Sequence, residues 1–316
     1  MTGGEPELRL DTITGEWVTI AGRRQGRPNL PSDDCPFCLG GLEAPEPYAV
    51  HAFPNRWPVL TAGPPLDEAS VDQLPARGAA EVVLYSPDHD ASLATIGVPG
   101  ARRVVDLWAE RTAALLDRPE VAYVLVFENR GRDVGATIDH PHGQIYAFPF
   151  VPPIPAREAE MARRGCPVCA EARRELGDGR RVVLDRGGWL GWVPFASSWP
   201  YGVLLAPRDH LDGLPGLSGE ARDGLARALV DLVGRYDRLF ATPFPYMLWV
   251  HQQPGDADAH VHVHLAPPRR GAAAIRYVAA GELGSGTLFN PVPPEDAAAQ
   301  LRAVGDDERR GSEAEA

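Results

Sequence analysis

The sequence lacks any run of apolar residues that approaches the roughly 18 needed to cross a bilayer. Its first residues also lack the basic start and apolar stretch of a secretory signal peptide. We therefore expect a cytoplasmic protein with no membrane segment. Basic residues are few as well, with 31 Lys and Arg against 43 Asp and Glu and a net charge of −12. Because nucleic-acid polymers are bound through clustered Lys and Arg, this balance argues against a general nucleic-acid-binding protein.

Cysteine is scarce, with four in 316 residues. The four form two tight pairs, Cys35-Pro-Phe-Cys38 and Cys166-Pro-Val-Cys169. In a cytosolic protein such pairs are typical of metal binding or redox chemistry rather than of structural disulfides. A disulfide within each pair is the alternative. The positions of the histidines favour metal.

Each cysteine pair is followed by a lone histidine after Asp and then by a run of alternating histidines. The lone histidine lies 51 residues after the second cysteine in the first half and 41 in the second, and the run begins 51 and 50 residues later. Two Cys and two His satisfy tetrahedral Zn²⁺, leaving no open position. We therefore predict one or two structural zinc sites, the alternative being metal-free polar clusters, with these ligands: Cys35, Cys38, His89 and His140 in the first, and Cys166, Cys169, His210 and His260 in the second.

Hydrophobic periodicity repeats along with these ligands. Residues 101–117 and 218–240 have apolar side chains at helical spacing, and each segment follows an Asp-His. Apolar strand-like runs at 121–127 and 246–250 then precede the histidine runs. We therefore predict a duplicated α+β unit.

The duplication suggests a division into two halves and a tail. We expect an N-terminal half at residues 1–155, which carries the catalytic motif, and a C-terminal half at residues 156–304. The last stretch, 305–316, consists of charged and small residues and is expected to be disordered.

The run His140-Pro141-His142-Gly143-Gln144 has the groups that phosphoryl chemistry needs. In an extended segment, alternate residues point to the same face, so His142 and Gln144 would lie together. An imidazole can attack phosphorus, and an amide can donate to a phosphate oxygen. The segment before it, residues 127–137, is rich in glycine and donor side chains, as phosphate-binding loops are. A metal clamp or a plain loop is the alternative interpretation of His-Pro-His alone.

Phe127-Glu128-Asn129 followed by this histidine run resembles the active-site signature of galactose-1-phosphate uridylyltransferases, in the histidine-triad superfamily. The resemblance covers nearly the whole chain and implies two histidine-triad-like halves with antiparallel sheets flanked by helices. It implies that His142, assisted by Gln144, takes UMP from a nucleotide sugar, UDP-glucose, and passes it to a sugar 1-phosphate, galactose 1-phosphate. The residues that it implies bind the substrate are Arg24, Arg27, Asn55, Asn129 and Thr137.

The segment around Arg276 and Tyr277 resembles a stretch that, in this family, reaches the nucleotide bound to the partner subunit. The resemblance therefore implies a homodimer with shared sites. An ordinary surface strand and turn is the competing interpretation.

Four further alternatives stay open. The second cysteine pair resembles the two-zinc arrangement of plant ADP-glucose phosphorylase, which would make inorganic phosphate the acceptor. In iron-containing members of the family, an iron site would match Glu158, His251, His262 and His264, and we expect iron only in place of the second zinc site. We interpret the run from His260 to His264 as a relic of the duplication that binds metal, and a hydrolase site centred on His262 is the alternative. A zinc-stabilised nucleotide sensor without activity is the last alternative.

Overall fold

The computed structural model describes residues 4–22, 24, 35–63, 72–255 and 258–314, the last nine of these by their backbone alone. The strands are β1 (Glu7–Asp11), β2 (Glu16–Ile20), β3 (His51–Pro54), β4 (Gln73–Pro75), β5 (Ala79–Leu84), β6 (Tyr123–Arg130), β7 (His142–Phe148), β8 (Val182–Arg186), β9 (Trp189–Trp192), β10 (Val203–Pro207), β11 (Tyr246–His251), β12 (His262–Ala266), β13 (Arg269–Gly271) and β14 (Ala274–Ile275). The helices are α1 (Gly97–Leu116), α2 (Pro153–Ala162), α3 (Pro167–Asp178), α4 (Gly219–Leu239), α5 (Ala280–Ser285) and α6 (Pro294–Ala314), with short 3-10 turns η2 (Arg132–Val134) and η3 (Leu214–Gly216).

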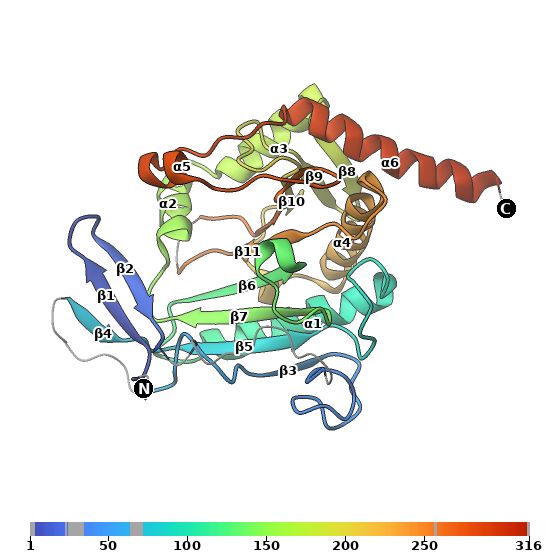
Figure 1. Ribbon diagram of the computed structural model, residues 1–316. Coiled ribbons are helices and arrows are strands. Elements are labelled where there is room, and N and C mark those ends of the chain that lie inside the picture. Colours follow the sequence, from blue (N-terminus) through green and yellow to red (C-terminus); the bar gives the residue numbers. More distant parts are fainter. Residues whose placement is uncertain (1–3, 23, 25–34, 64–71, 256–257, 315–316) are drawn as a thin grey trace.

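Nine strands form one antiparallel sheet in the order β3-β5-β7-β6-β11-β12-β10-β9-β8 (Figure 1). The pairing of β6 with β11 joins the two halves. Outward from this junction, the first half runs β6, β7, β5, β3 and the second runs β11, β12, β10, β9. α1 follows β5, and α4 follows β10 at the equivalent place. The prediction of a duplicated α+β unit with antiparallel strands and flanking helices is thus confirmed.

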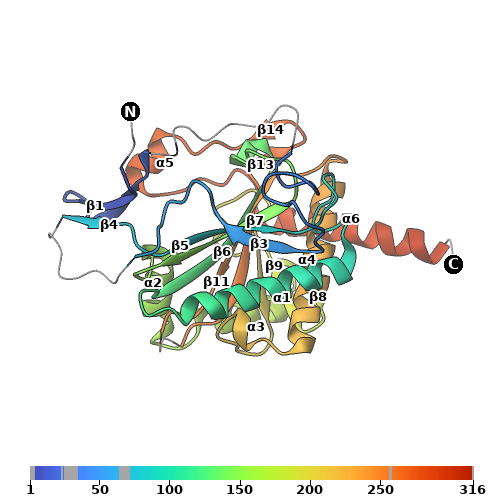
Figure 2. The same cartoon turned by 90° about the horizontal axis from the view of Figure 1, so that it is seen from below.

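Helices α1 and α4 cover one face of the sheet, as Figure 2 shows for α1. α4 begins at Ser218, whose side chain accepts a hydrogen bond from the backbone N–H of Ala221 at 3.1 Å. Leu225, Leu229 and Leu232 of α4 are fully buried and form an apolar stripe against the sheet. The large core between helices and sheet therefore fixes the strands that carry the histidines. None of the described helices is long and apolar enough to span a membrane.

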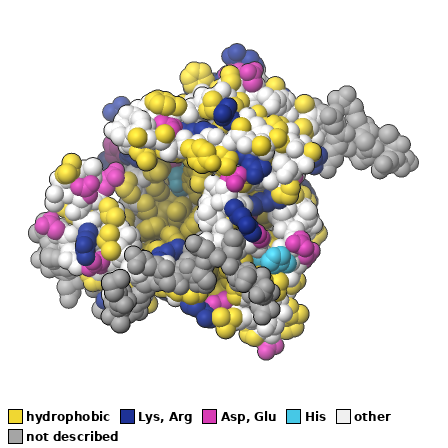
Figure 3. Space-filling view, in the orientation of Figure 1, with side chains coloured by type: hydrophobic (Ala, Val, Ile, Leu, Met, Phe, Trp, Pro, Cys, Tyr) yellow, Lys and Arg dark blue, Asp and Glu magenta, His cyan; other side chains and the backbone are white. Residues whose placement is uncertain are grey.

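The other face of the sheet is hollowed near its middle. A cavity of about 710 Å³ lies there, and apolar side chains of β6 and β11 line it, among them Leu125, Phe127, Met247 and Trp249. Figure 3 shows the hollow with hydrophobic side chains in its wall. A small separate sheet, β2-β1-β4, stands beside it.

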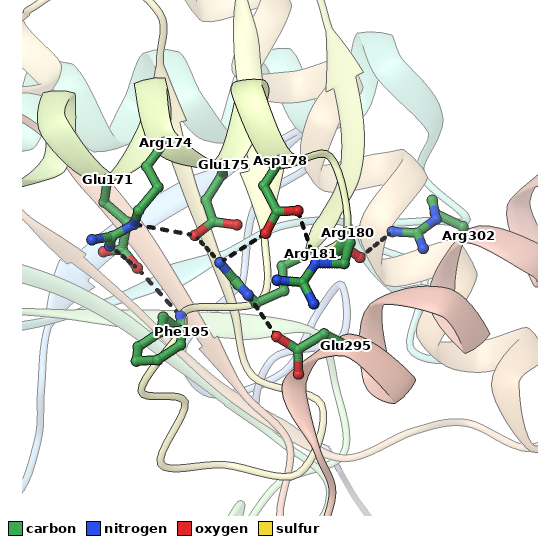
Figure 4. A network of polar contacts seen from close by, with 9 residues as sticks. All are labelled: Glu171, Arg174, Glu175, Asp178, Arg180, Arg181, Phe195, Glu295 and Arg302. Atoms are coloured by element: carbon green, nitrogen blue, oxygen red, sulfur yellow. Dashed lines mark hydrogen bonds and ion pairs between the residues drawn. The ribbon is translucent and has the colours of Figure 1, made fainter.

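α6 is attached to the second half through a buried arginine (Figure 4). The guanidinium of Arg181 is 3% exposed and lies 2.9 Å from Glu175 of α3 and 2.5 Å from Glu295 of α6. Further along α6, Arg302 donates to the backbone carbonyl of Val182 at 2.6 Å. Because Glu175 is itself completely buried, loss of Arg181 would leave its carboxylate with only the longer, 3.8 Å contact to Arg174.

The prediction of a disordered tail from residue 305 differs from the structure, in which α6 continues to Ala314. The charged composition suggested disorder, but the segment is rich in Ala, Glu and Arg, which are good helix formers. The first turn of α6 also contains Glu295 and Asp296, which favour a helix N-terminus.

Candidate active site and metal centres

β7 presents His142 and Gln144 on the same face of the sheet. Nδ1 of His142 lies 2.8 Å from the backbone carbonyl oxygen of His140 and donates to it. This bond fixes the ring and the tautomer in which Nε2 carries the lone pair. The edge of the imidazole faces the ring of Phe37, with centroids 5.1 Å apart. The arrangement is that of an oriented nitrogen nucleophile.

Gln144 is oriented by a neighbour from the end of β3. Its Oε1 accepts a hydrogen bond from Nδ2 of Asn55 at 3.3 Å, while Asn55 Oδ1 accepts from the backbone N–H of Trp57 at 2.9 Å. With its oxygen engaged, Gln144 has its N–H groups available as donors. The two predicted residues therefore form one polar unit beside His142.

A cavity of about 1040 Å³ opens over this unit. The residues that line it include His142, Gln144, Asn55 and Thr137, together with the loop that carries the first cysteine pair. Its size suits a nucleotide-linked ligand. Of the described lining residues, only Glu43 and Arg56 belong to the charged types, and they pair at 2.8 Å.

Asn129 and Thr137 occupy different places. The glycine-rich loop turns at Gly131 and Gly135, which both have positive φ, and brings Thr137 to the 1040 Å³ cavity. Asn129 lines the 710 Å³ hollow instead. β6 pairs with β7 at Phe127 and Gln144, and continuing that register places Asn129 beside His142. Asn129 therefore stands at the border between the two cavities.

The structure brings together Cys35, Cys38, His89 and His140. Cys38 Sγ lies 3.5 Å from Nδ1 of His89 and 3.6 Å from Nδ1 of His140. With Zn–S near 2.3 Å and Zn–N near 2.0 Å, a tetrahedral zinc ion separates such atoms by about 3.5 Å. The donor set and its spacing thus fit zinc.

The ring nitrogen of His140 that faces away from the cysteines, Nε2, is hydrogen-bonded to other parts of the chain. Nε2 donates to the backbone carbonyl of Ser86 at 2.7 Å, and the hydroxyl of Tyr48 lies 3.0 Å from it. Burial lowers the pKa of His140, which favours the neutral, metal-binding form. Such outer contacts keep a ligand histidine in the correct tautomer. Since the carbonyl of His140 also holds His142, the cluster and the nucleophile share one segment of backbone.

The second predicted cluster is also assembled. Cys169 Sγ lies 3.5 Å from Nδ1 of His210 and 3.3 Å from Nδ1 of His260, and Cys166 completes the set. The cysteines lie at the N-terminus of α3, where Cys166 accepts from the backbone N–H of Cys169. The donor types and distances match those of the first cluster.

A third cluster contains Glu158, His251, His262 and His264, with ligand atoms within 4.8 Å of one another. Glu158 lies 2.8 Å from Nδ1 of His251 and 3.7 Å from Nε2 of His262. Burial raises the pKa of Glu158, but hydrogen bonds from the two histidines outweigh it and hold that pKa below its ordinary value.

The expectation that this cluster would replace the second cysteine cluster needs correction, because the two use different side chains. His260 belongs to one, while His262 and His264 belong to the other. Both sets of ligands are assembled in the same chain. The sequence suggested an exclusion because all three histidines lie in one alternating run.

The second histidine run repeats the backbone bond of the first but not its surroundings. Nδ1 of His262 lies 2.7 Å from the carbonyl oxygen of His260, as in the first copy. Its Nε2, however, faces Glu158 across 3.7 Å, and the cavity there measures about 190 Å³. That volume is well below the roughly 300 Å³ of small ligand sites. The site therefore suits a metal ion better than a nucleotide.

The structure describes two of the three predicted basic residues, Arg24 and Arg276. Nη1 of Arg24 donates to the carbonyl of Trp57 at 3.1 Å, near Asn55, whereas Arg27 lies outside the described residues. Arg276 is 6% exposed and its guanidinium bonds to Glu282 within its own chain, which differs from the expected outward reach. Tyr277 is 73% exposed.

Sequence reasoning missed two residues that shape the site, Phe37 and Tyr48. The rings of Phe37 and His142 meet edge to face, and Tyr48 donates to the carbonyl of Phe37 while touching His140. The place of Phe37 between two cysteines was a usable signal. Tyr48 had none, because its contacts connect segments far apart in the sequence.

Two family models match the chain: "Galactose-1-phosphate uridyl transferase, N-terminal domain" over residues 49–152 and the C-terminal domain of the same name over residues 161–311. A galactose-1-phosphate uridylyltransferase of Thermotoga maritima is 38% identical, covering 94% of this chain and 98% of its own. A solved uridylyltransferase structure superposes with a TM-score of 0.85 at 29% identity, covering 95% and 99% of the two chains. An ADP-glucose phosphorylase from Arabidopsis thaliana shares the fold, with a TM-score of 0.71 at 23% identity over 95% and 98%.

Proposed function

Because the chain belongs to the galactose-1-phosphate uridylyltransferase family, we propose that it is the enzyme that moves UMP between UDP-glucose and galactose 1-phosphate. The observation that carries the proposal is His142, fixed through Nδ1 and set beside Gln144 in the 1040 Å³ cavity. The equivalent His262 faces a carboxylate in a far smaller cavity, which argues against the hydrolase alternative. The fixed imidazole and the oriented amide, which ligand binding alone does not require, likewise argue against a sensor without activity.

In the first half-reaction, Nε2 of His142 attacks the α-phosphorus of UDP-glucose. The new N–P bond replaces the bond from phosphorus to the bridging oxygen, whose electron pair leaves with glucose 1-phosphate. The imidazole becomes cationic, and its Nδ1–H stays on the carbonyl of His140. In the second half, a phosphate oxygen of galactose 1-phosphate attacks the same phosphorus and Nε2 leaves with its lone pair restored.

Gln144 would stabilise charge on the transferred phosphoryl group. Its Oε1 is engaged by Asn55, so its N–H donors are set toward the non-bridging oxygens before the substrate arrives. Thr137 would bind phosphate from the glycine-rich loop, and Asn129 would do so at the border of the cavity. Arg24 and Arg27 are proposed to approach the nucleotide from the opening segment of the chain.

Zinc would be held by the two Cys₂His₂ clusters, and iron or a similar ion by Glu158 and its three histidines. Closed four-ligand zinc sites supply folding free energy rather than chemistry. A zinc ion in the first cluster would fix the backbone at His140 and thereby the orientation of the His142 ring.

We also propose a homodimer in which the segment after β14 reaches the partner's nucleotide. Tyr277, Leu283 and Phe289 project from this segment with exposed fractions of 73%, 75% and 61%. Arg276 stacks its guanidinium 4.6 Å from the ring of Trp199 and anchors the segment to its own subunit. Tyr277 is thus the residue of the pair that would cross to the partner.

The function is tested by labelling and release. Incubation with UDP-glucose carrying a labelled α-phosphorus should leave stoichiometric label on the protein. Galactose 1-phosphate should then remove the label as UDP-galactose, whereas inorganic phosphate should leave it in place. Release by phosphate instead would identify a phosphorylase, and a protein that never acquires label would refute the covalent mechanism. Because uracil is not dictated by the described side chains, ADP-glucose is the matched competitor.

Replacing Gln144 by Ala should lower kcat by about 10²-fold, the usual cost of one preorganised donor to a transition-state oxyanion. KM for UDP-glucose should change little, because the donor acts on charge that develops during transfer. Steady-state kinetics on each half-reaction measures both constants. Asn55→Ala is the companion variant: it removes the bond that orients Gln144, together with the bond to Trp57, but leaves the Gln144 amide in place and should show a smaller kcat loss. A rise in KM alone would assign Gln144 to ground-state binding.

A further inference from the structure

The sheet buries an acidic group directly behind the catalytic strand. Phe127 and Asn129 of β6 line the hollow face, so Glu128 points to the other side, into the core. Glu128 is 4% exposed, and its Oε1 accepts a hydrogen bond from the hydroxyl of Tyr246 at 3.1 Å. A carboxyl group in a protein core is rare unless it has a role. Neither the metal clusters nor the transfer mechanism above uses this one.

A tyrosine connects this buried group to the nucleophile segment. A Cβ added at Gly143 would lie 2.1 Å from the hydroxyl oxygen of Tyr85, so that oxygen fills the space beside the glycine. The backbone N–H of Tyr85 also donates to the carbonyl of Pro141 at 3.1 Å. Tyr85 therefore contacts the backbone on both sides of His142. The β6–β7 register, continued by one residue, sets Glu128 opposite Gly143.

Three buried polar atoms here make no hydrogen bond to the described part of the chain: Tyr85 Oη, Trp108 Nε1 and Glu128 Oε2. The rings of Tyr85 and Trp108 meet edge to face, with centroids 5.9 Å apart. Leaving such groups unpaired in a core is costly. An indole donor, a carboxyl acceptor and a hydroxyl that can act as either therefore lie in this part of the core.

We propose that Tyr85 and Glu128 are positioning residues for the transfer reaction, which hold the Gly143 backbone from the core side of the sheet. The inference rests on the proposed function, since it assigns a role in aiming His142 and Gln144. His142 gains a positive charge on forming the nucleotidyl intermediate and loses it again. Support of β7 from its core side would keep the imidazole and the amide donor in the same relative positions during both steps.

The charge of the buried carboxyl can follow the solution pH. Burial raises the pKa of Glu128 to about 7, while Arg130 and the hydrogen bond from Tyr246 act against that rise. The groups that face it are Tyr246 from β11, Tyr85 after β5, and Arg130 from its own strand, whose guanidinium pairs with Asp237 of α4 at 2.8 Å. The hydrogen-bond pattern of the unit should therefore change near neutral pH.

The test uses Tyr85→Phe and Glu128→Gln in the full-length protein, after the wild type has been shown to transfer UMP. Each variant should lose about 10-fold in kcat for both half-reactions, with KM within about twofold, because positioning acts on the transition state. In Glu128→Gln, the kcat profile should lose the contribution of the buried carboxyl near pH 7. The matched control is Tyr236→Phe, which removes a buried hydroxyl bonded to the carbonyl of Tyr201 and should cost stability without changing kcat.

A second arm tests the contact itself. Gly143→Ala places a methyl group against the hydroxyl of Tyr85 and should lower kcat by about 10²-fold. Adding Tyr85→Phe removes the oxygen and should restore about 10-fold of that loss, a coupling that independent sites would not show.

Wild-type kcat in both Tyr85→Phe and Glu128→Gln, or strictly additive effects in the double variant, would overturn the positioning role. If Tyr85→Phe does not fold, Glu128→Gln and its pH profile decide the question. A wild-type protein that transfers no nucleotide would instead refute the proposed function.

Discussion

Replacing His142 by Gly should lower UMP transfer by at least about 10⁴-fold and abolish covalent labelling by UDP-glucose, because the nucleophile is lost. The fold should survive, since Nδ1 of the side chain bonds to a backbone carbonyl only two residues earlier, that of His140. Quench-flow labelling and thermal unfolding of the purified variant measure the two effects separately.

His262→Gly is the matched control for this variant. It removes a histidine with the same strand position and the same Nδ1 bond to a carbonyl two residues earlier. Label should still be acquired, and only the metal content of the Glu158 cluster should fall. The reverse pattern, with label lost in His262→Gly and kept in His142→Gly, would move the active site to the second half.

Cys38→Ser should lower kcat by about 10³-fold and remove one zinc ion, because the first cluster would no longer hold the His140 backbone that orients His142. Structural zinc sites are worth about 10 kcal/mol or more, so the unfolding temperature should fall as well. Metal analysis by mass spectrometry, together with kinetics below the unfolding temperature, distinguishes misorientation of His142 from unfolding of the protein.

Cys169→Ser makes the same chemical change in the second half. The sulfur lies at comparable distances from its two histidines, 3.5 and 3.3 Å, but this cluster does not share a segment with His142. It should therefore lose zinc and stability while retaining most of kcat. Equal loss of kcat in both variants would show that the first cluster acts on the whole fold and not on the nucleophile.

Sequence periodicity located the main elements because each half must bury one face of its strands under one helix. The helix expected at 218–240 is α4 (Gly219–Leu239), and the strand expected at 246–250 is β11 (Tyr246–His251). Ligand spacing placed the two cysteine clusters because the duplication repeats the same donors in the same order, and two Cys with two His suit tetrahedral zinc.

What the sequence did not reveal depends on contacts between distant segments. Arg276 looked free to reach a partner, but Glu282 and Trp199 hold it within its own chain. Glu158 comes from α2, 93 residues before His251. No local sequence pattern therefore indicated that the Glu158 cluster assembles in the same chain as the second cysteine cluster. The helical end of α6 was missed because charge was weighed above helix propensity.

The pairing of β6 with β11 has a consequence for how the chain is made. β6 ends at Arg130 and its partner strand begins at Tyr246, so more than a hundred residues must leave the ribosome before that edge is covered. Until then, a nascent first half presents an uncovered row of N–H and C=O groups that invites pairing with a neighbouring chain. Truncated forms that stop before β11 should accordingly aggregate, and the catalytic half would not be obtained as a separate soluble fragment.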